Sequence, residues 1–209
     1  MAKFNKDVTV EQIIDAYTRL GYPLYTSGDY NLNIFGIRDD ENVSDSFNDL
    51  ICVLYKVDGK WVLKKYNATT DPGLYYRKKL LNPNGTAILQ DGYYRSTWQI
   101  GLHRGKYTAL VQRKPVKLWR DGNKDNVLDR KGKTYDELAG INIHHASSIG
   151  TSPSIGQYSA GCQVIANIND WNEFISIVLK SADKFGKVFS YALFTESQFF
   201  NKGKTNEKV

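Results

Sequence analysis

The sequence predicts an α+β fold that is mostly β, with one domain spanning residues 1–209. Short runs of β-branched and aromatic residues recur from Asn31 onward, and helical periodicity is confined to two segments. The chain of 209 residues shows no abrupt change in composition that would mark a second domain. Its 14 Tyr, 9 Phe and 4 Trp also exclude a disordered chain, because so many aromatic side chains favour a packed core.

The first helix is expected over residues 8–20, where apolar residues recur at helical spacing: Val10, Ile13, Ile14, Tyr17 and Leu20. Thr9 is suited to the N-cap and Gly21 to the residue that ends the helix. A second helix is expected from Asn169 to about Phe185, after the segment that carries the chemistry.

Strands are predicted wherever short β-type runs occur: Leu32–Ile37, Leu50–Val57, Trp61–Tyr66, Tyr107–Gln112, Val116–Trp119, Ile141–His144 and Val188–Phe194. Asp58-Gly59 indicates a tight hairpin between two of them. Residues 69–99 are rich in Gly, Pro, Asn and Tyr, so they predict loops with short strands that expose aromatic side chains. Residues 196–209 predict a polar, frayed tail.

The net charge of +6 favours contact with a polyanion, such as nucleic acid, anionic lipid or a cell-wall polymer. The Lys and Arg residues are scattered in ones and twos, which is typical of a solvated surface, so nucleic acid is not predicted as a partner. No segment has the length of a signal peptide's apolar core or of a membrane span. We therefore expect cytoplasmic synthesis without a signal peptide and no membrane span, and the sequence predicts no particular oligomeric state.

The two cysteines, Cys52 and Cys162, lack the spacing of a disulfide framework or a zinc site. Cys52 lies in an apolar run and is read as a core residue, so Cys162 is the candidate nucleophile. His144 and His145 are adjacent, which does not suit a helical zinc motif. Residues 121–129 alternate oxygen-bearing side chains as calcium loops do, but Asn126 and Gly132 replace the required Gly and Glu, which favours a polar turn. No metal or cofactor is predicted.

The chemistry is concentrated between Ile141 and Ile165. A strand that ends in His144 is followed by a loop and then by a tight turn, Ser159-Ala160-Gly161-Cys162. Imidazole beside a thiol supplies a base for the nucleophile and later returns the proton. Gly161 allows a close backbone turn that could aim amide N–H groups at a developing oxyanion.

This segment resembles the catalytic motif of the L,D-transpeptidases, in which an Ile-His strand is followed by Ser/Thr-His-Gly-Cys. Here 14 residues separate His144 from Ser159, and the resemblance covers about 25 residues of the chain. It implies a β sheet or sandwich of L,D-transpeptidase type, Cys162 as nucleophile, His144 as base, and Ser159 and Gly161 in the turn and oxyanion site. The implied substrates are peptidoglycan peptides, and the reaction is hydrolysis or acyl transfer through a thioester.

Two positions depart from the family pattern: Ala160 stands where the family has a second His, and Val164 where it has Arg or Asn. We assign substrate contacts to His103, Gln163, Trp98 and Tyr158, with Gln163 as a replacement for a lost polar contact. His145 should point away from His144 because side chains alternate along a strand.

Three further segments resemble an arrangement in phage-encoded relatives of this fold: Thr70–Gly73, Trp98–Gly105 and Trp119–Asp121. The resemblance implies an endolysin or a virion-associated enzyme that reaches the wall during infection. Asp71 in the first segment is read as a turn former in preference to a catalytic acid. The alternative that stays open is a non-catalytic virion or wall-binding protein that keeps the fold, and Ala160 and Val164 support it.

Overall fold

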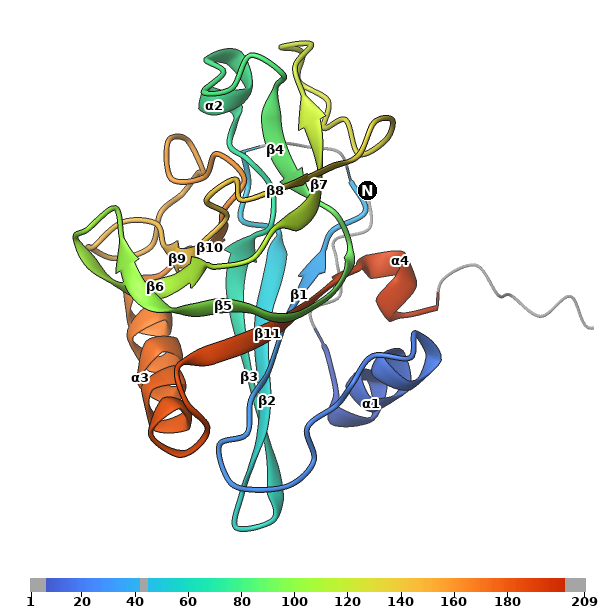
Figure 1. Cartoon of the computed structure of the whole chain (residues 1–209), viewed down its shortest axis with the longest axis vertical. Helices are drawn as coiled ribbons and strands as arrows, with labels where there is room; N and C mark the ends of the chain where they lie inside the picture. Colours follow the sequence, from blue (N-terminus) through green and yellow to red (C-terminus); the bar gives the residue numbers. More distant parts are fainter. Residues whose placement is uncertain (1–6, 42–44, 202–209) are drawn as a thin grey trace, which may run out of the picture.

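The computed structural model describes residues 7–41 and 45–201, in which eight strands close into a barrel and three more form a small sheet at one end (Figure 1). The barrel strands are β1 (Asn33–Arg38), β2 (Asp49–Val57), β3 (Lys60–Thr69), β5 (Gly92–His103), β6 (Tyr107–Gln112), β9 (Ile143–His145), β10 (Gln163–Ile165) and β11 (Val188–Thr195). The small sheet contains β4 (Thr86–Leu89), β7 (Val116–Asp121) and β8 (Tyr135–Glu137). The helices are α1 (Val10–Arg19), α2 (Leu74–Lys78), α3 (Ile168–Phe185) and α4 (Glu196–Phe199).

Around the barrel the strand order is β1-β11-β5-β6-β9-β10-β3-β2. The β1–β11 and β9–β10 pairs are parallel, and the other pairs are antiparallel. The prediction of a mostly β, mostly antiparallel fold with a leading helix and a helix after Cys162 is therefore confirmed. The strands close on one another, however, and do not form two separate packed sheets.

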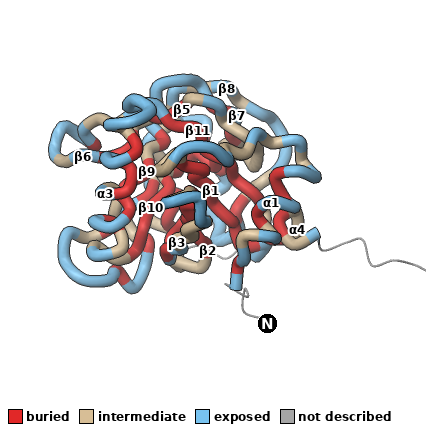
Figure 2. The backbone as a smooth tube through the Cα atoms, turned by 90° about the horizontal axis from the view of Figure 1, so that it is seen from below, coloured by how far each residue is buried: buried red, intermediate tan, exposed pale blue. Residues whose placement is uncertain are grey.

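Strand β2 shows how the apolar runs are used. Its first seven residues are all buried, because both faces of the strand are covered. Ile51 and Val53 join the larger core, whereas Leu50, Cys52 and Leu54 join a second core on the opposite face. Figure 2 shows a similar pattern for the described residues: those in the strands are largely buried, and those in the surrounding loops are largely exposed.

Helix α1 covers the second core and begins as the sequence predicts. The Thr9 side chain accepts from the Gln12 N–H while the Gln12 side chain accepts from the Thr9 N–H, which forms a capping box. Helix α4 lies beside α1 (Figures 1 and 2), and the Arg19 guanidinium of α1 donates to the backbone carbonyls of Gln198 and Phe199. The two helices therefore cover the second core together, on one face of β1, β2 and β11.

The prediction for residues 69–99 is wrong in one respect. This segment contains α2, β4 and the first part of β5, and at 12 residues β5 is longer than any other described strand. Its alternation was hidden by an irregularity: the β5–β11 register shifts between Phe189 and Tyr191, and Ser96 has a φ of 53°. Strands β8 and β10 and helices α2 and α4 were not predicted, because each has only three to five residues.

The expected polar tail is also corrected. Residues Glu196–Phe199 form α4, capped by the Thr195 side chain, which accepts from the Gln198 N–H. The Phe199 side chain is buried in the second core and anchors the helix there. The last residues of the expected tail, 202–209, lie outside the described residues.

The Asp58-Gly59 hairpin is confirmed as the turn between β2 and β3, and both residues have positive φ, 50° and 75°. Cys52 is a core residue, as predicted. None of the helices in the described part of the chain has the length and apolar character that crossing a bilayer requires.

Candidate active site

Cys162 lies in a tight turn directly before β10. The buried Ser159 hydroxyl accepts from the Gly161 N–H at 3.2 Å and donates to the Cys162 carbonyl at 2.8 Å, so it closes the turn. The Ser159 carbonyl accepts from the Gly73 N–H at 2.9 Å, which ties the turn to the segment after β3. Ser159 thus acts on Cys162 by holding its backbone.

Gly161 is required in this turn for two reasons. Its φ of +122° lies in a region that side chains rarely adopt, and a Cβ atom there would meet the Ala87 carbonyl oxygen of β4 at 2.6 Å. The turn before Cys162 is therefore packed against the small sheet with no room for a side chain.

Strand pairing places Cys162 opposite Asn142, two residues before His144. In the parallel β9–β10 pair, Gln163 is opposite Ile143 and Val164 is opposite His144, which places Cys162 across from Asn142. The Asn142 N–H donates to the Cys162 Sγ at 3.5 Å, and the thiol donates to the Gly140 carbonyl at 3.5 Å. Because side chains alternate along β9, Asn142 and His144 lie on the same face.

Cys162 and His144 line one cavity, with a volume of about 170 Å³. The predicted substrate residues His103 and Tyr158 line it as well. Cys162 is partly exposed and the Tyr158 side chain is 40% exposed, so the cavity opens to solvent beside them. The structure therefore brings together four of the eight residues assigned from the sequence.

The hydrogen bonds of His144 define its chemical form. Its Nδ1 lies 2.7 Å from the backbone carbonyl oxygen of His145, so Nδ1 carries the proton and donates to that carbonyl. The Tyr107 hydroxyl also lies 3.3 Å from Nδ1. The buried Nε2 has no partner among the described residues, so its lone pair is free to accept a proton.

His103 and Asn142 form a second layer around this imidazole. The His103 ring stacks on the His144 ring with centroids 4.0 Å apart. The Asn142 amide donates to the His103 Nδ1 at 3.1 Å, and its carbonyl oxygen accepts from the Gln112 N–H at 3.0 Å. His103 is thus held as a neutral ring with its proton on Nε2.

The electrostatics of the site favour neutral groups. Burial, with a smaller contribution from the neighbouring His103, lowers the pKa of His144 to about 3. Burial lowers the pKa of His103 to about 4, and burial raises the pKa of the Cys162 thiol. The resting site consequently holds a thiol beside a neutral imidazole, without a preformed ion pair.

A candidate oxyanion donor accompanies the thiol. The Cys162 N–H makes no hydrogen bond to any other residue that the structure describes. An amide at the nucleophile itself is well placed to donate to the oxygen of a carbonyl under attack. Gly161 contributes by letting this turn adopt its conformation, whereas its own N–H is already bonded to Ser159.

Gln163 and Trp98 lie elsewhere. The buried Gln163 amide donates to the Thr70 carbonyl and accepts from the Tyr191 hydroxyl at 2.9 Å. The Trp98 indole is fully buried and donates to the Ile141 carbonyl at 2.7 Å. Both side chains support the barrel, and neither lines the thiol cavity.

Ala160 lies at a junction between two cavities. A second cavity of about 270 Å³ lies beside the small sheet and shares Leu81, Ala139 and Ala160 with the thiol cavity. Arg120 and Glu137 form an ion pair in its lining.

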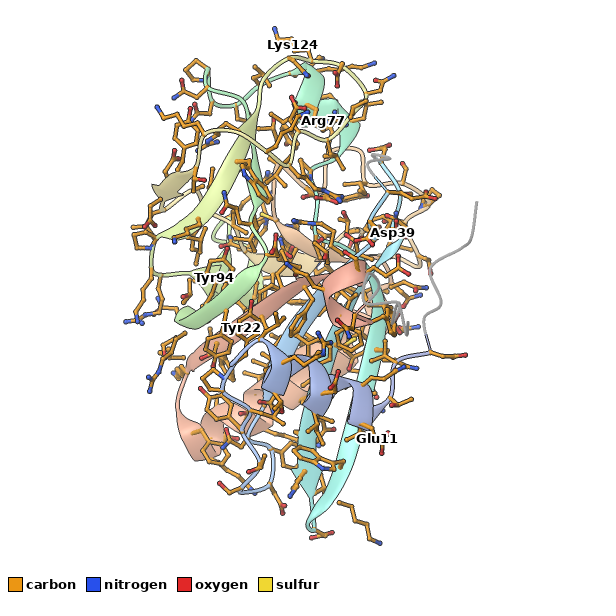
Figure 3. The ribbon with its side chains drawn as sticks, turned by 90° about the vertical axis from the view of Figure 1, so that its right-hand side faces the viewer. Glu11, Tyr22, Asp39, Arg77, Tyr94 and Lys124 are labelled. Atoms are coloured by element: carbon orange, nitrogen blue, oxygen red, sulfur yellow. The ribbon has the colours of Figure 1, made fainter. Side chains whose placement is uncertain are left out.

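The two acidic segments considered from the sequence are structural. Asp71 is buried and pairs with Arg38 at 3.2 Å and Arg130 at 2.6 Å. The loop after Asp121 closes on Arg77, which pairs with Asp121 at 2.7 Å and donates to backbone carbonyls of the loop. Figure 3 shows Arg77 at the end of the molecule that also carries Lys124 of this loop.

The loop is thus the polar turn that the sequence favours, with the Asn123 amide donating to Asp125 and Asp129 at 3.0 and 2.9 Å. Within the described ranges, no group of three or more His, Cys, Asp or Glu residues is arranged to hold a metal ion.

Sequence reasoning missed Asn142, Tyr107 and Arg104. The alternation that separates His144 from His145 also places Asn142 beside His144, and this signal was present in the sequence. Tyr107 and Arg104 come from the β5–β6 hairpin, which pairs His103 with Tyr107. Their place at the site depends on long-range pairing of β6 with β9, through Leu110 and Ile143, which no local pattern reveals.

His145 points away from the cavity and stacks on Tyr107, with centroids 4.1 Å apart.

No protein-family model, curated protein or solved structure matches this chain.

Proposed function

We propose that the chain is a cysteine-dependent enzyme that hydrolyses or exchanges peptide bonds through a thioester on Cys162. The observation that carries the proposal is the unpartnered, buried Nε2 of His144 in the wall of the cavity that also holds the Cys162 thiol. A base with a fixed tautomer beside a partly exposed thiol is the arrangement that nucleophilic catalysis needs.

The reaction follows from the protonation states. The Cys162 Sγ attacks the substrate carbonyl carbon while the His144 Nε2 takes the thiol proton. The Cys162 N–H donates to the oxyanion of the tetrahedral intermediate. When the C–N bond breaks, Nε2 returns the proton to the leaving amine, and a thioester remains. Water or an amine then attacks this thioester, which releases the product and restores the thiol.

The proposed substrates are peptidoglycan peptides. The resemblance of residues 141–165 to the L,D-transpeptidase motif supports this substrate class and a fold of L,D-transpeptidase type. The net charge of +6 supports contact with an anionic wall polymer. Such a protein would act as an endolysin or a virion-associated enzyme that reaches the wall during phage infection.

The test is turnover of purified stem peptides, followed by mass spectrometry of the products. Wild type should cleave or exchange a peptide bond, and Cys162→Ala should abolish the reaction. Cys52→Ala is the matched control, because Cys52 is fully buried in the second core and should leave turnover unchanged. Equal turnover by wild type and Cys162→Ala would contradict the proposal.

A second candidate is a non-catalytic virion or wall-binding protein. The raised pKa of the Cys162 thiol favours it, because it leaves the thiol protonated and less reactive at neutral pH. Ala160 and Val164, where the L,D-transpeptidases carry polar groups, favour it as well. Binding to purified peptidoglycan without turnover of any stem peptide would support this candidate over the enzyme.

A further inference from the structure

The charged side chain that lines the thiol cavity is that of Arg104, which is positive. Arg104 lines it together with neutral groups such as Leu81, Asn142 and Tyr158, and no carboxylate is among the lining residues. The Arg104 side chain is exposed and forms no ion pair or hydrogen bond with any residue in the ranges 7–41 and 45–201. An unpaired guanidinium is therefore available at the cavity that holds Cys162.

The backbone holds Arg104 in a defined place. Arg104 and Gly105 form the turn between β5 and β6, with φ values of 50° and 70°, and the Lys106 N–H donates to the His103 carbonyl at 3.0 Å. Positive φ at both central residues is the signature of a type I′ turn, which matches the twist of a hairpin. Arg is unfavourable at the first of these positions, where Asn is common, so Arg104 does not stabilise the turn.

The positive charge of Arg104 interacts electrostatically with the Cys162 thiol and the two imidazoles of the site. Burial is the main cause of the pKa shifts of Cys162, His103 and His144, and the positive charge of Arg104 makes a smaller contribution to each, which is consistent with its place in the lining of the same cavity. Because both imidazoles are neutral, they add no competing charge. An anionic group that enters the cavity would meet a guanidinium with several free N–H donors.

We propose that Arg104 binds a carboxylate of the substrate, so that the site selects acyl donors with a free carboxylate close to the scissile carbonyl. This inference rests on the proposed function and narrows its substrates to anionic peptides. The cation comes from the turn between β5 and β6, whereas Cys162 directly precedes β10.

The test uses two small alkylating probes, iodoacetate and iodoacetamide, which differ in charge. Both react with the thiolate of Cys162, so the ratio of their rates cancels any change in the thiol pKa. The rates are measured by peptide mapping at Cys162 in wild type, Arg104→Asn and Lys106→Asn. Lys106 is the matched control, because it belongs to the same turn and does not line the cavity.

We expect Arg104→Asn to lower the iodoacetate-to-iodoacetamide rate ratio by about three- to fivefold, as for loss of one partly exposed charge pair. Lys106→Asn should leave the ratio within about twofold, because its charge lies outside the cavity. An unchanged ratio in Arg104→Asn would overturn the proposal. An equal fall in both variants would also overturn it, because the effect would then come from overall charge.

Paired stem peptides that end in a carboxylate or a carboxamide separate this inference from the proposed function. Wild type should prefer the carboxylate form in kcat/KM, and Arg104→Asn should lose that preference. Turnover of both forms at equal rates by wild type would overturn the carboxylate site while the enzyme stands. Probe selectivity that depends on Arg104, without turnover of any peptide, would support the anion site and contradict the enzyme.

Discussion

At the scale of single residues, the site depends on a few side chains whose hydrogen-bond partners hold them in one position. The His145 carbonyl assigns the proton to Nδ1 of His144, and the Ser159 hydroxyl holds the Cys162 turn. Each of these contacts joins residues close in sequence, and the motif that contains them is also what led us to propose Cys162 as nucleophile and His144 as base. Arg104 and Tyr107 come from the β5–β6 hairpin, and no local pattern placed them at the site, whereas His103 of the same hairpin was assigned to it from the sequence.

Gly161 provides the first prediction. Gly161→Ala should destabilise the protein by about 2–4 kcal/mol, because the new Cβ would meet the Ala87 carbonyl oxygen in a left-handed backbone conformation. Gly132→Ala is the control: Gly132 also has positive φ, but its Cβ would meet nothing within 4 Å, so the cost should be about 1 kcal/mol. Urea unfolding measures both, and equal losses would show that contact with β4 is unimportant.

The reactivity of Cys162 provides the second prediction. Burial raises the pKa of its thiol, so its alkylation rate should rise with pH and reach its midpoint above about 8.5, the value for an unperturbed cysteine. His144→Gln should shift this midpoint little, because the His144 imidazole is already neutral at these pH values. Rates of iodoacetamide labelling, measured between pH 5 and pH 10, give this midpoint for both proteins. A plateau that begins below pH 7 would indicate a thiolate–imidazolium pair.

At the scale of secondary-structure elements, the sequence predicted best those segments whose stability is local. The capping box of α1 and the Asp58-Gly59 turn are encoded by neighbouring residues, and both are present. Strand β10 has only three residues and is held between β9 and β3. A segment this short shows no hydrophobic alternation from which a strand could be predicted. Strand β5 was missed for a different reason, since its bulge breaks the alternation that identifies a strand.

The β5–β6 hairpin carries the third prediction. Arg104→Asn should stabilise the protein by about 0.5 kcal/mol, because Asn adopts positive φ more readily than Arg at the first central position of a type I′ turn. Thermal unfolding of wild type and Arg104→Asn measures the change. A lower melting temperature in the variant would mean that Arg104 stabilises the fold, and its place at the cavity would then need no ligand.

At the scale of the whole molecule, the closed barrel and its two cores determine the electrostatics of the site. Closure buries β9 and β10 between β6 and β3, and the stacked His103 and His144 are buried with them. The mostly β class was predictable from composition and alternation. Closure was not, because it depends on the parallel β1–β11 and β9–β10 pairs, which join segments far apart in sequence or separated by an irregular loop.

Burial of His144 carries the fourth prediction. Its folded pKa, about 3, lies below the unfolded value of about 6.5, so the unfolded chain binds more protons as the pH falls. The free energy of unfolding is therefore unaffected by His144 well above pH 6.5, and it falls progressively as the pH drops below this value. Between pH 7 and pH 5 the wild type should lose about 2 kcal/mol more than His144→Gln. Parallel pH dependences in chemical unfolding of the two proteins would contradict a buried, neutral His144.

In the proposed reaction, Cys162 forms a thioester with its substrate. Intact-mass spectrometry after rapid acid quenching of protein with purified stem peptides detects this intermediate, and it should be applied to wild type, Cys162→Ala and His144→Gln. The wild type should carry an acyl adduct that maps to Cys162 and is released by hydroxylamine, and Cys162→Ala should carry none. His144→Gln should form the adduct more slowly by about 100-fold or more, as expected when a general base is lost. Turnover of the same peptides with no adduct at Cys162, or unchanged turnover in Cys162→Ala, would contradict a thioester on Cys162.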